Sequence, residues 1–178
     1  MVFKMRYRIE KDSLGYKKIP SESYYGIHTE RSKETFKVSG RRIDLSMFLY
    51  IALIKIAATK ANMELGFLDK KRGNAIVRSA HEILDGKFND YFVIDIFQSG
   101  AGTSTHMNVN EVIANRAVEL LGGNKGDYSI VHPNDHVNMG QSTNNVFPTA
   151  MKISCYVKLE KLLENLGDLR KELAKKSN

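Results

Sequence analysis

Residues 145–176 of this 178-residue chain read NVFPTAMKISCYVKLEKLLENLGDLRKELAKK. This segment contains no helix breaker except Pro148 and Gly167, and a proline is tolerated in the first turn of a helix. Apolar side chains recur at intervals of three and four, which places them on one helical face. They are Met151, Cys155, Leu159, Leu162, Leu166, Leu169 and Leu173. The pattern predicts one long helix with a single apolar stripe.

The expected length of this helix has a structural consequence. About 30 helical residues span roughly 45 Å, more than the ~30 Å width of a compact domain of this size. The rest of the chain offers too little helix of matching length to cover the stripe. We therefore expect the first helix of a bundle whose other members are missing. The alternative is a terminal helix that folds back onto its own domain.

Two further helices are predicted upstream from their end signals. One is capped by Asp44 or Ser46 and runs to Leu65, and the other begins near Asp69 and ends at Gly86. The second has apolar residues at helical spacing. They are Ile76, Val77, Ala80, Ile83 and Leu84.

A third shorter helix is indicated between the glycine-rich tract near residue 100 and the glycine pair at 122–123. Its apolar positions are Val109, Val112, Ile113, Ala117, Leu120 and Leu121. Residues 1–43 are expected to be irregular or partly extended, and residues 124–144 to form a polar loop. Since no alternation suggests a large sheet, the predicted fold class is mainly α.

Composition limits the classes of function. The chain has a formal charge of +7 and a single cysteine, Cys155, which excludes a disulfide framework and fits a reducing, cytoplasmic location. Its basic clusters have no interleaved aromatic residues, so solvated helix ends and a site that prefers anions are favoured over nucleic-acid binding.

No signal peptide or membrane span is expected. The N-terminus has no apolar core segment of the kind a signal peptide requires. The most apolar run, residues 47–58, is interrupted by Lys55 and is shorter than the ~20 residues a membrane helix needs. We interpret it as a core helix of a soluble protein.

Three polar tracts carry the candidate chemistry. The first, residues 100–108, reads GAGTSTHMN, and its glycines allow close backbone approach while Thr103, Ser104 and Thr105 offer hydroxyls just before a helix. It suits a carboxylate or phosphate, but glycines and hydroxyl caps before a helix are also ordinary loop chemistry.

The other two tracts are residues 132–138, HPNDHVN, and residues 141–145, QSTNN. In the latter, Ser142, Thr143 and Asn144 precede the long helix, where N–H groups are unpaired and the helix dipole is positive. That arrangement can hold a carboxylate, and plain helix capping explains it equally well.

A metal site is not expected. His132 and His136 have i,i+4 spacing, but Pro133 disfavours helical geometry at His132 and no Cys or Glu joins the pair. We predict no metal and no cofactor.

Taken together, the tracts resemble a known family. Residues 95–117, DIFQSGAGTSTHMNVNEVIANRA, and residues 132–150, HPNDHVNMGQSTNNVFPTA, are similar to the fumarase/aspartase superfamily. The N-terminal pattern around residues 8–31 also fits. The resemblance covers nearly the whole chain, in order and without large gaps.

The resemblance implies a subunit of three parts. Residues 1–140 would form an N-terminal, mostly helical domain, and residues 141–178 the start of a central helical bundle. A small C-terminal domain follows in the family. Four subunits pack their bundles together into a homotetramer, and each active site collects residues from three chains.

The implied activity is that of an aspartate ammonia-lyase, which converts L-aspartate to fumarate and ammonia. Residues 100–104 and 141–144 have the aspartase-like form, whereas residues 131–135 and 107–116 lean towards fumarase. A class II fumarate hydratase, acting on malate and fumarate, is therefore the alternative. A non-enzymatic interaction domain of lyase-like fold is a third possibility.

The resemblance also assigns residues. Thr103, Ser142 and Thr143 would hold the substrate carboxylate next to the carbon that loses its proton, and Asn144 would lie near the amino group. Further candidate binding residues are Gly102, Asn108, His132, Asn134 and Asp135. The resemblance places the Thr103 and Ser142 segments of one site on different subunits, so they need not be close within one chain.

No catalytic residue is expected in this chain, because the family's proton-abstracting serine lies in a signature that the sequence lacks. The isolated chain should therefore be inactive. Hydroxyls and N–H groups aimed at the enediolate oxygens would stabilise the charge that develops during elimination. Three positions depart from the common pattern: His28 replaces Gln, His106 replaces Asn and Asn145 replaces Asp.

Overall fold

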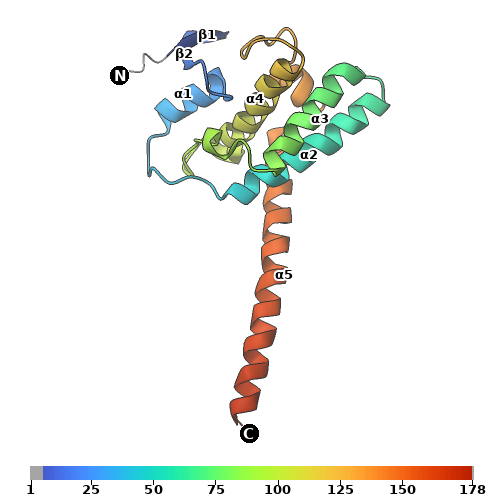
Figure 1. Cartoon of the computed structure of the whole chain (residues 1–178). Coiled ribbons are helices and arrows are strands. Elements are labelled where there is room, and N and C mark those ends of the chain that lie inside the picture. Colours follow the sequence, from blue (N-terminus) through green and yellow to red (C-terminus); the bar gives the residue numbers. More distant parts are fainter. Residues whose placement is uncertain (1–5, 178) are drawn as a thin grey trace.

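The computed structural model describes residues 6–177 and consists of a helical head from which one long helix projects (Figure 1). The fold is mainly α, as predicted. In chain order the longer elements are β1 (Tyr7–Asp12), β2 (Gly15–Pro20), α1 (Ile27–Thr35), α2 (Leu45–Glu64), α3 (Lys70–Leu84), α4 (Thr103–Leu120) and α5 (Thr143–Ser177). Three short helical turns are η1 (Asn89–Tyr91), η2 (Gly100–Gly102) and the π-helical η3 (Pro133–Val137).

The N-terminal region is more ordered than its sequence suggested. β1 and β2 form an antiparallel hairpin in which Tyr7 lies opposite Pro20, which confirms the expected extended character. The helix α1 was missed. Its first N–H groups are capped from a distant part of the chain, because the Glu111 carboxylate on α4 accepts from Gly26, His28 and Thr29. No local pattern reveals such a cap.

The predicted helices α2 and α3 are confirmed, with their caps. Asp44 accepts from the N–H of Ser46, and Asp69 accepts from the N–H of Arg72. The third predicted helix, α4, begins at Thr103, so the hydroxyl tract forms its first turn instead of preceding it.

The helix α4 runs through the centre of the head. It contacts α1, α2, α3 and α5, and six of its apolar residues are fully buried. These are Val109, Val112, Ile113, Ala114, Ala117 and Val118. Because α4 is enclosed by its neighbours, the packing of the head fixes where its first turn lies.

The helix α2 is long and apolar enough, by length and composition, to cross a membrane. That observation is weak evidence, because core helices pass the same test. Here α2 packs against α3 and α5 and contributes seven buried residues, which makes it a core helix of the head.

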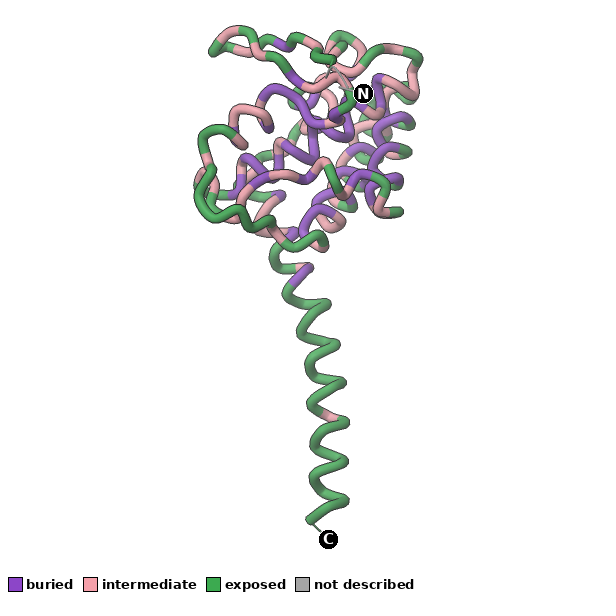
Figure 2. Tube along the Cα trace, turned by 60° about the vertical axis from the view of Figure 1, so that its left-hand side comes forward, coloured by how far each residue is buried: buried purple, intermediate pink, exposed green. Residues whose placement is uncertain are grey.

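The helix α5 leaves the head after about three turns (Figure 2). Val146, Ala150 and Ser154 are buried, whereas the predicted apolar stripe is exposed, from 47% at Met151 to 60% at Leu173. The helix therefore does not fold back onto the head. Pro148 lies in the second turn, not the first, because the helix begins at Thr143.

Candidate active site

Two of the predicted tracts lie side by side at the starts of α4 and α5. Gly102, the residue before α4, is buried and has a φ of +75°. The ring of Phe147 on α5 packs directly against it. Gly102 therefore has a structural reason to be glycine, since a side chain here would meet both backbone strain and a neighbouring ring.

A side-chain hydrogen bond also joins the two helices. His106 Nδ1 on α4 lies 2.7 Å from Thr143 Oγ1, the first residue of α5. The head packs the start of α5 against the start of α4, so the two tracts are close within one chain, although the resemblance did not require it.

Beneath this contact lies Lys55, a residue of α2 that is fully buried. Its Nζ is 2.6 Å from His106 Nε2, 2.8 Å from Asn138 Oδ1 and 2.9 Å from Gln141 Oε1. Sequence reasoning noticed Lys55 only as an interruption of an apolar run. A lysine on an otherwise apolar, core-facing helix was the available signal, since buried lysines need polar partners.

Burial dominates the electrostatics of this cluster. It lowers the pKa of Lys55 well below its usual value and, together with the positive charge of Lys55, lowers the pKa of His106 to about 3. His106 is therefore neutral near pH 7, with one ring nitrogen donating and the other accepting.

The predicted substrate-holding residues are accessible at the two helix starts. Ser142 and Asn144 are exposed, and Thr103 and Thr143 are half-buried. The Ser142 hydroxyl accepts from the N–H of Asn144 at 3.2 Å and thereby caps α5. Ser142 therefore does cap α5, and its exposed hydroxyl can still donate a hydrogen bond to a ligand.

The first turn of α4 separates its three hydroxyls. Ser104 bonds to Ser32, and Thr105 accepts from the Gln98 amide. Within residues 6–177 the Thr103 hydroxyl bonds to no other group, and Gly102 provides no side-chain cap. Thr103 is therefore the hydroxyl available to a ligand at this helix start.

The turn before Thr103 is strained. Ala101 has a φ of +60° and is the one non-glycine residue with positive φ in the described part of the chain. Such left-handed conformations in residues with a side chain are uncommon and cluster at functional sites.

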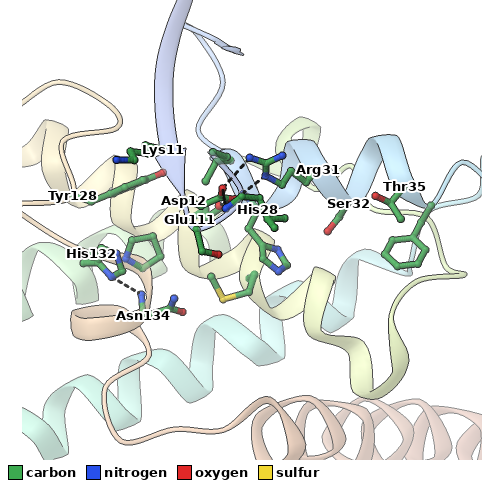
Figure 3. A pocket seen from close by; sticks show the side chains of 16 residues that line it. Lys11, Asp12, His28, Arg31, Ser32, Thr35, Glu111, Tyr128, His132 and Asn134 are labelled. Atoms are coloured by element: carbon green, nitrogen blue, oxygen red, sulfur yellow. Dashed lines mark hydrogen bonds and ion pairs between the residues drawn. The ribbon is translucent and has the colours of Figure 1, made fainter. Parts of the chain in front are cut away.

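The remaining predicted residues lie elsewhere. Asn108 is buried, accepting from the N–H of Val93 and donating to the carbonyl of Tyr91, so the structure gives it a structural role. His132 and Asn134 line a separate cavity of about 420 Å³ between the hairpin, α1, α4 and η3 (Figure 3). Its lining includes none of Thr103, Ser142, Thr143 or Asn144.

The histidines of η3 are engaged locally. His132 Nδ1 accepts from the N–H groups of Asn134 and Asp135, while His136 Nδ1 accepts from the N–H of His132. The side chain of Asp135 is exposed. Because both Nδ1 atoms accept backbone N–H groups, the i,i+4 pair does not form a chelating face.

Comparison with known proteins places this geometry in a family. A family described as lyase matches residues 15–178. An aspartate ammonia-lyase of a Bacillus species is 50% identical over 171 residues, covering 96% of this chain and 36% of that protein. Fumarate hydratase class II 2 of Bradyrhizobium diazoefficiens is 48% identical over 170 residues, covering 95% and 36%.

Solved structures agree. The fumarate lyase:delta crystallin of Brucella melitensis superposes with a TM-score of 0.83 at 46% identity, covering 85% of this chain and 34% of that one. The class II fumarase of Schistosoma mansoni gives a TM-score of 0.80 at 44% identity, covering 84% and 32%. The chain spans about a third of the length of these relatives.

The chain belongs to the fumarase/aspartase superfamily of lyases and corresponds to its N-terminal part.

Proposed function

We propose that the chain is the N-terminal segment of an aspartate ammonia-lyase, which eliminates ammonia from L-aspartate to give fumarate. The observation that carries the proposal is the meeting of two helix starts, those of α4 and α5, with the free Thr103 hydroxyl on one and Ser142, Thr143 and Asn144 on the other. The 50% identity to the Bacillus aspartate ammonia-lyase supports this substrate.

The proposed chemistry follows from these groups. Removing the proton beside a carboxylate makes an enediolate with added negative charge on two oxygens. Thr103 and Thr143 hydroxyls, together with the positive ends of two helix dipoles, would stabilise that charge. Asn144 would contact the amino group that leaves. The proton-abstracting base would come from the part of a complete subunit outside this sequence.

A class II fumarate hydratase is the second candidate. The Bradyrhizobium fumarate hydratase is 48% identical over nearly the same residues, close to the value for the ammonia-lyase. Both reactions pass through the same type of enediolate, so this half of the site would serve either. The two differ in the group that leaves.

We also propose a homotetramer in which α5 joins a central bundle, and a cytoplasmic location. The exposed stripe of α5 supports the first, because a continuous apolar face of this length needs a partner. The single cysteine agrees with the second.

The test is an assay of a complete subunit that contains this chain. Ammonia release from L-aspartate is expected, with little dehydration of L-malate. The reverse preference would select the hydratase, and activity towards neither would refute both. The isolated 178-residue chain should show no activity, so host lyases must be removed before that control is measured.

A further inference from the structure

Lys55 is a buried amine without an acidic partner. It is fully buried on α2, and within residues 6–177 no carboxylate forms an ion pair with it. Its Nζ instead contacts three neutral atoms: Asn138 Oδ1, Gln141 Oε1 and His106 Nε2. An ammonium group has three N–H donors, and a neutral amine has two donors and one acceptor, so either form can make all three contacts.

The orientations of the two amides determine which way these hydrogen bonds run. Asn138 Nδ2 donates to the carbonyl of Gln141, and Gln141 Nε2 donates to the carbonyls of Val137 and Met139. Since both amide nitrogens are occupied as donors, both amide oxygens must face Lys55 as acceptors. Lys55 therefore donates two of its N–H groups to them.

The third contact of Lys55 has two possible proton arrangements. If Lys55 is an ammonium, its third N–H donates to His106 Nε2, and the imidazole proton lies on Nδ1. The Nδ1–H group then donates to Thr143 Oγ1, and the Thr143 hydroxyl proton points away from His106. If Lys55 is a neutral amine, both hydrogen bonds of His106 run the other way. His106 Nε2–H then donates to Lys55 Nζ, and the Thr143 hydroxyl donates to His106 Nδ1.

We infer that Lys55 is the ammonium form, which holds His106 as the Nδ1–H tautomer and thereby directs the Thr143 hydroxyl proton outward, toward an anionic carboxylate at the site. The two amide oxygens aimed at Nζ and the short 2.6 Å contact with His106 stabilise the charged donor against the burial that lowers the pKa of Lys55. An anionic ligand supplies the opposite charge that the protein omits.

In this arrangement Lys55 and His106 are positioning residues, and Thr143 is the group that touches the ligand. This role for Thr143 rests on the proposed function. The proton arrangement does not, because it follows from the hydrogen bonds within the chain and can be measured without substrate.

The first experiment is nitrogen-15 NMR of the histidine-labelled 178-residue chain. We expect a neutral His106 with its proton on Nδ1 at pH 7. In Lys55→Met the Nε2 acceptor loses its donor, and the His106 signals should shift to a mixture of tautomers. Thr149→Val, on the same helix as Thr143, should leave them unchanged. A proton on Nε2 in the unmodified chain overturns the inference, even if Lys55→Met fails to fold.

The second experiment uses a complete subunit containing this chain. Thr143→Val and Lys55→Met should each lower kcat by about 10²-fold through loss of one positioned donor, with a smaller change in KM. Thr143→Ser, which keeps the hydroxyl, should restore most of the rate. A folded Lys55→Met enzyme with unchanged kcat overturns the inference. If the unmodified subunit is inactive on both substrates, the proposed function fails, and the NMR result still decides the tautomer.

Discussion

The ring of Phe147 on α5 packs against the backbone of Gly102 at the start of α4. A Cβ added at Gly102 would lie 2.5 Å from three carbons of that ring. This contact brings the two helix starts together and so sets the spacing between Thr103 and the residues of the Ser142 tract. It explains why a residue that the family resemblance suggested for substrate binding must be glycine for packing.

Alanine substitutions at Gly102 and Gly66 should separate the energetic cost of a positive φ from the cost of crowding against Phe147. Gly66 has almost the same φ, +76°, but open space around its Cβ position. Gly66→Ala should cost about 1–2 kcal/mol of unfolding free energy from the left-handed conformation alone. Gly102→Ala should cost roughly 1–3 kcal/mol more, because Phe147 must move. Urea unfolding measures both, and equal losses would mean that the ring yields without cost.

Thr103 and Ser142 should respond differently to removal of their hydroxyls. In a complete subunit, Thr103→Val and Ser142→Ala should each lower turnover by about 10²–10³-fold if both hold the enediolate. Thr103→Val should leave stability nearly unchanged, since Thr103 is only half-buried and no hydrogen bond of its hydroxyl is found within residues 6–177. Ser142→Ala should also cost about 1 kcal/mol, because the cap on Asn144 is lost. A destabilised Ser142→Ala enzyme with full turnover would identify Ser142 as a cap only.

Acid should destabilise the chain partly through His106. Burial and Lys55 lower its pKa to about 3, whereas an unfolded histidine has a pKa near 6.5. Between these values the unfolded chain binds a proton that the folded chain does not, so stability falls as pH falls through this window. The loss should approach about 1.4 kcal/mol per pH unit.

His106→Asn should flatten this pH dependence, since asparagine does not titrate. His81→Asn is the matched control, because His81 is exposed on α3. Urea unfolding at several pH values from 7 to about 4 compares the slopes. If His106→Asn keeps the slope of the unmodified chain, the histidine is not the titrating group.

Glu111 should be required for the helix α1. Its carboxylate accepts from three N–H groups at the start of α1, with distances of 2.8 to 3.0 Å. Glu111→Gln places an amide donor against these donors and should cost about 1–3 kcal/mol. Glu64→Gln, at an exposed position of α2, should cost little. Equal melting temperatures for the two variants would show that α1 does not need this cap.

The apolar stripe of α5 should drive self-association of the isolated chain. Leu166 is 49% exposed at the centre of the stripe, and Lys171 lies on the opposite face. Leu166→Glu should weaken association and binding of a hydrophobic dye, whereas Lys171→Gln, which changes the charge by the same amount, should not. Analytical ultracentrifugation measures the association. A strictly monomeric unmodified chain that binds no dye would contradict the expectation.

Most of the helical fold could be predicted because its signals are local. The caps at Asp44 and Asp69 lie next to the helices they begin, and the spacing of leucines along α5 requires only the helical period. The helix α1 could not be predicted in this way, since its cap, Glu111, lies more than 80 residues away in sequence.

The candidate site shows the same division. The sequence by itself determined the polar tracts and their family, because residue types and order are sufficient for a motif. Only the tertiary structure brought His106 to Thr143 and placed Lys55 beneath both. Those contacts join α2, α4 and α5, and the packing of the core determines how these helices meet. A lysine in an apolar helix acquires its role only when α4 and the loop before α5 bring its three hydrogen-bond partners to it.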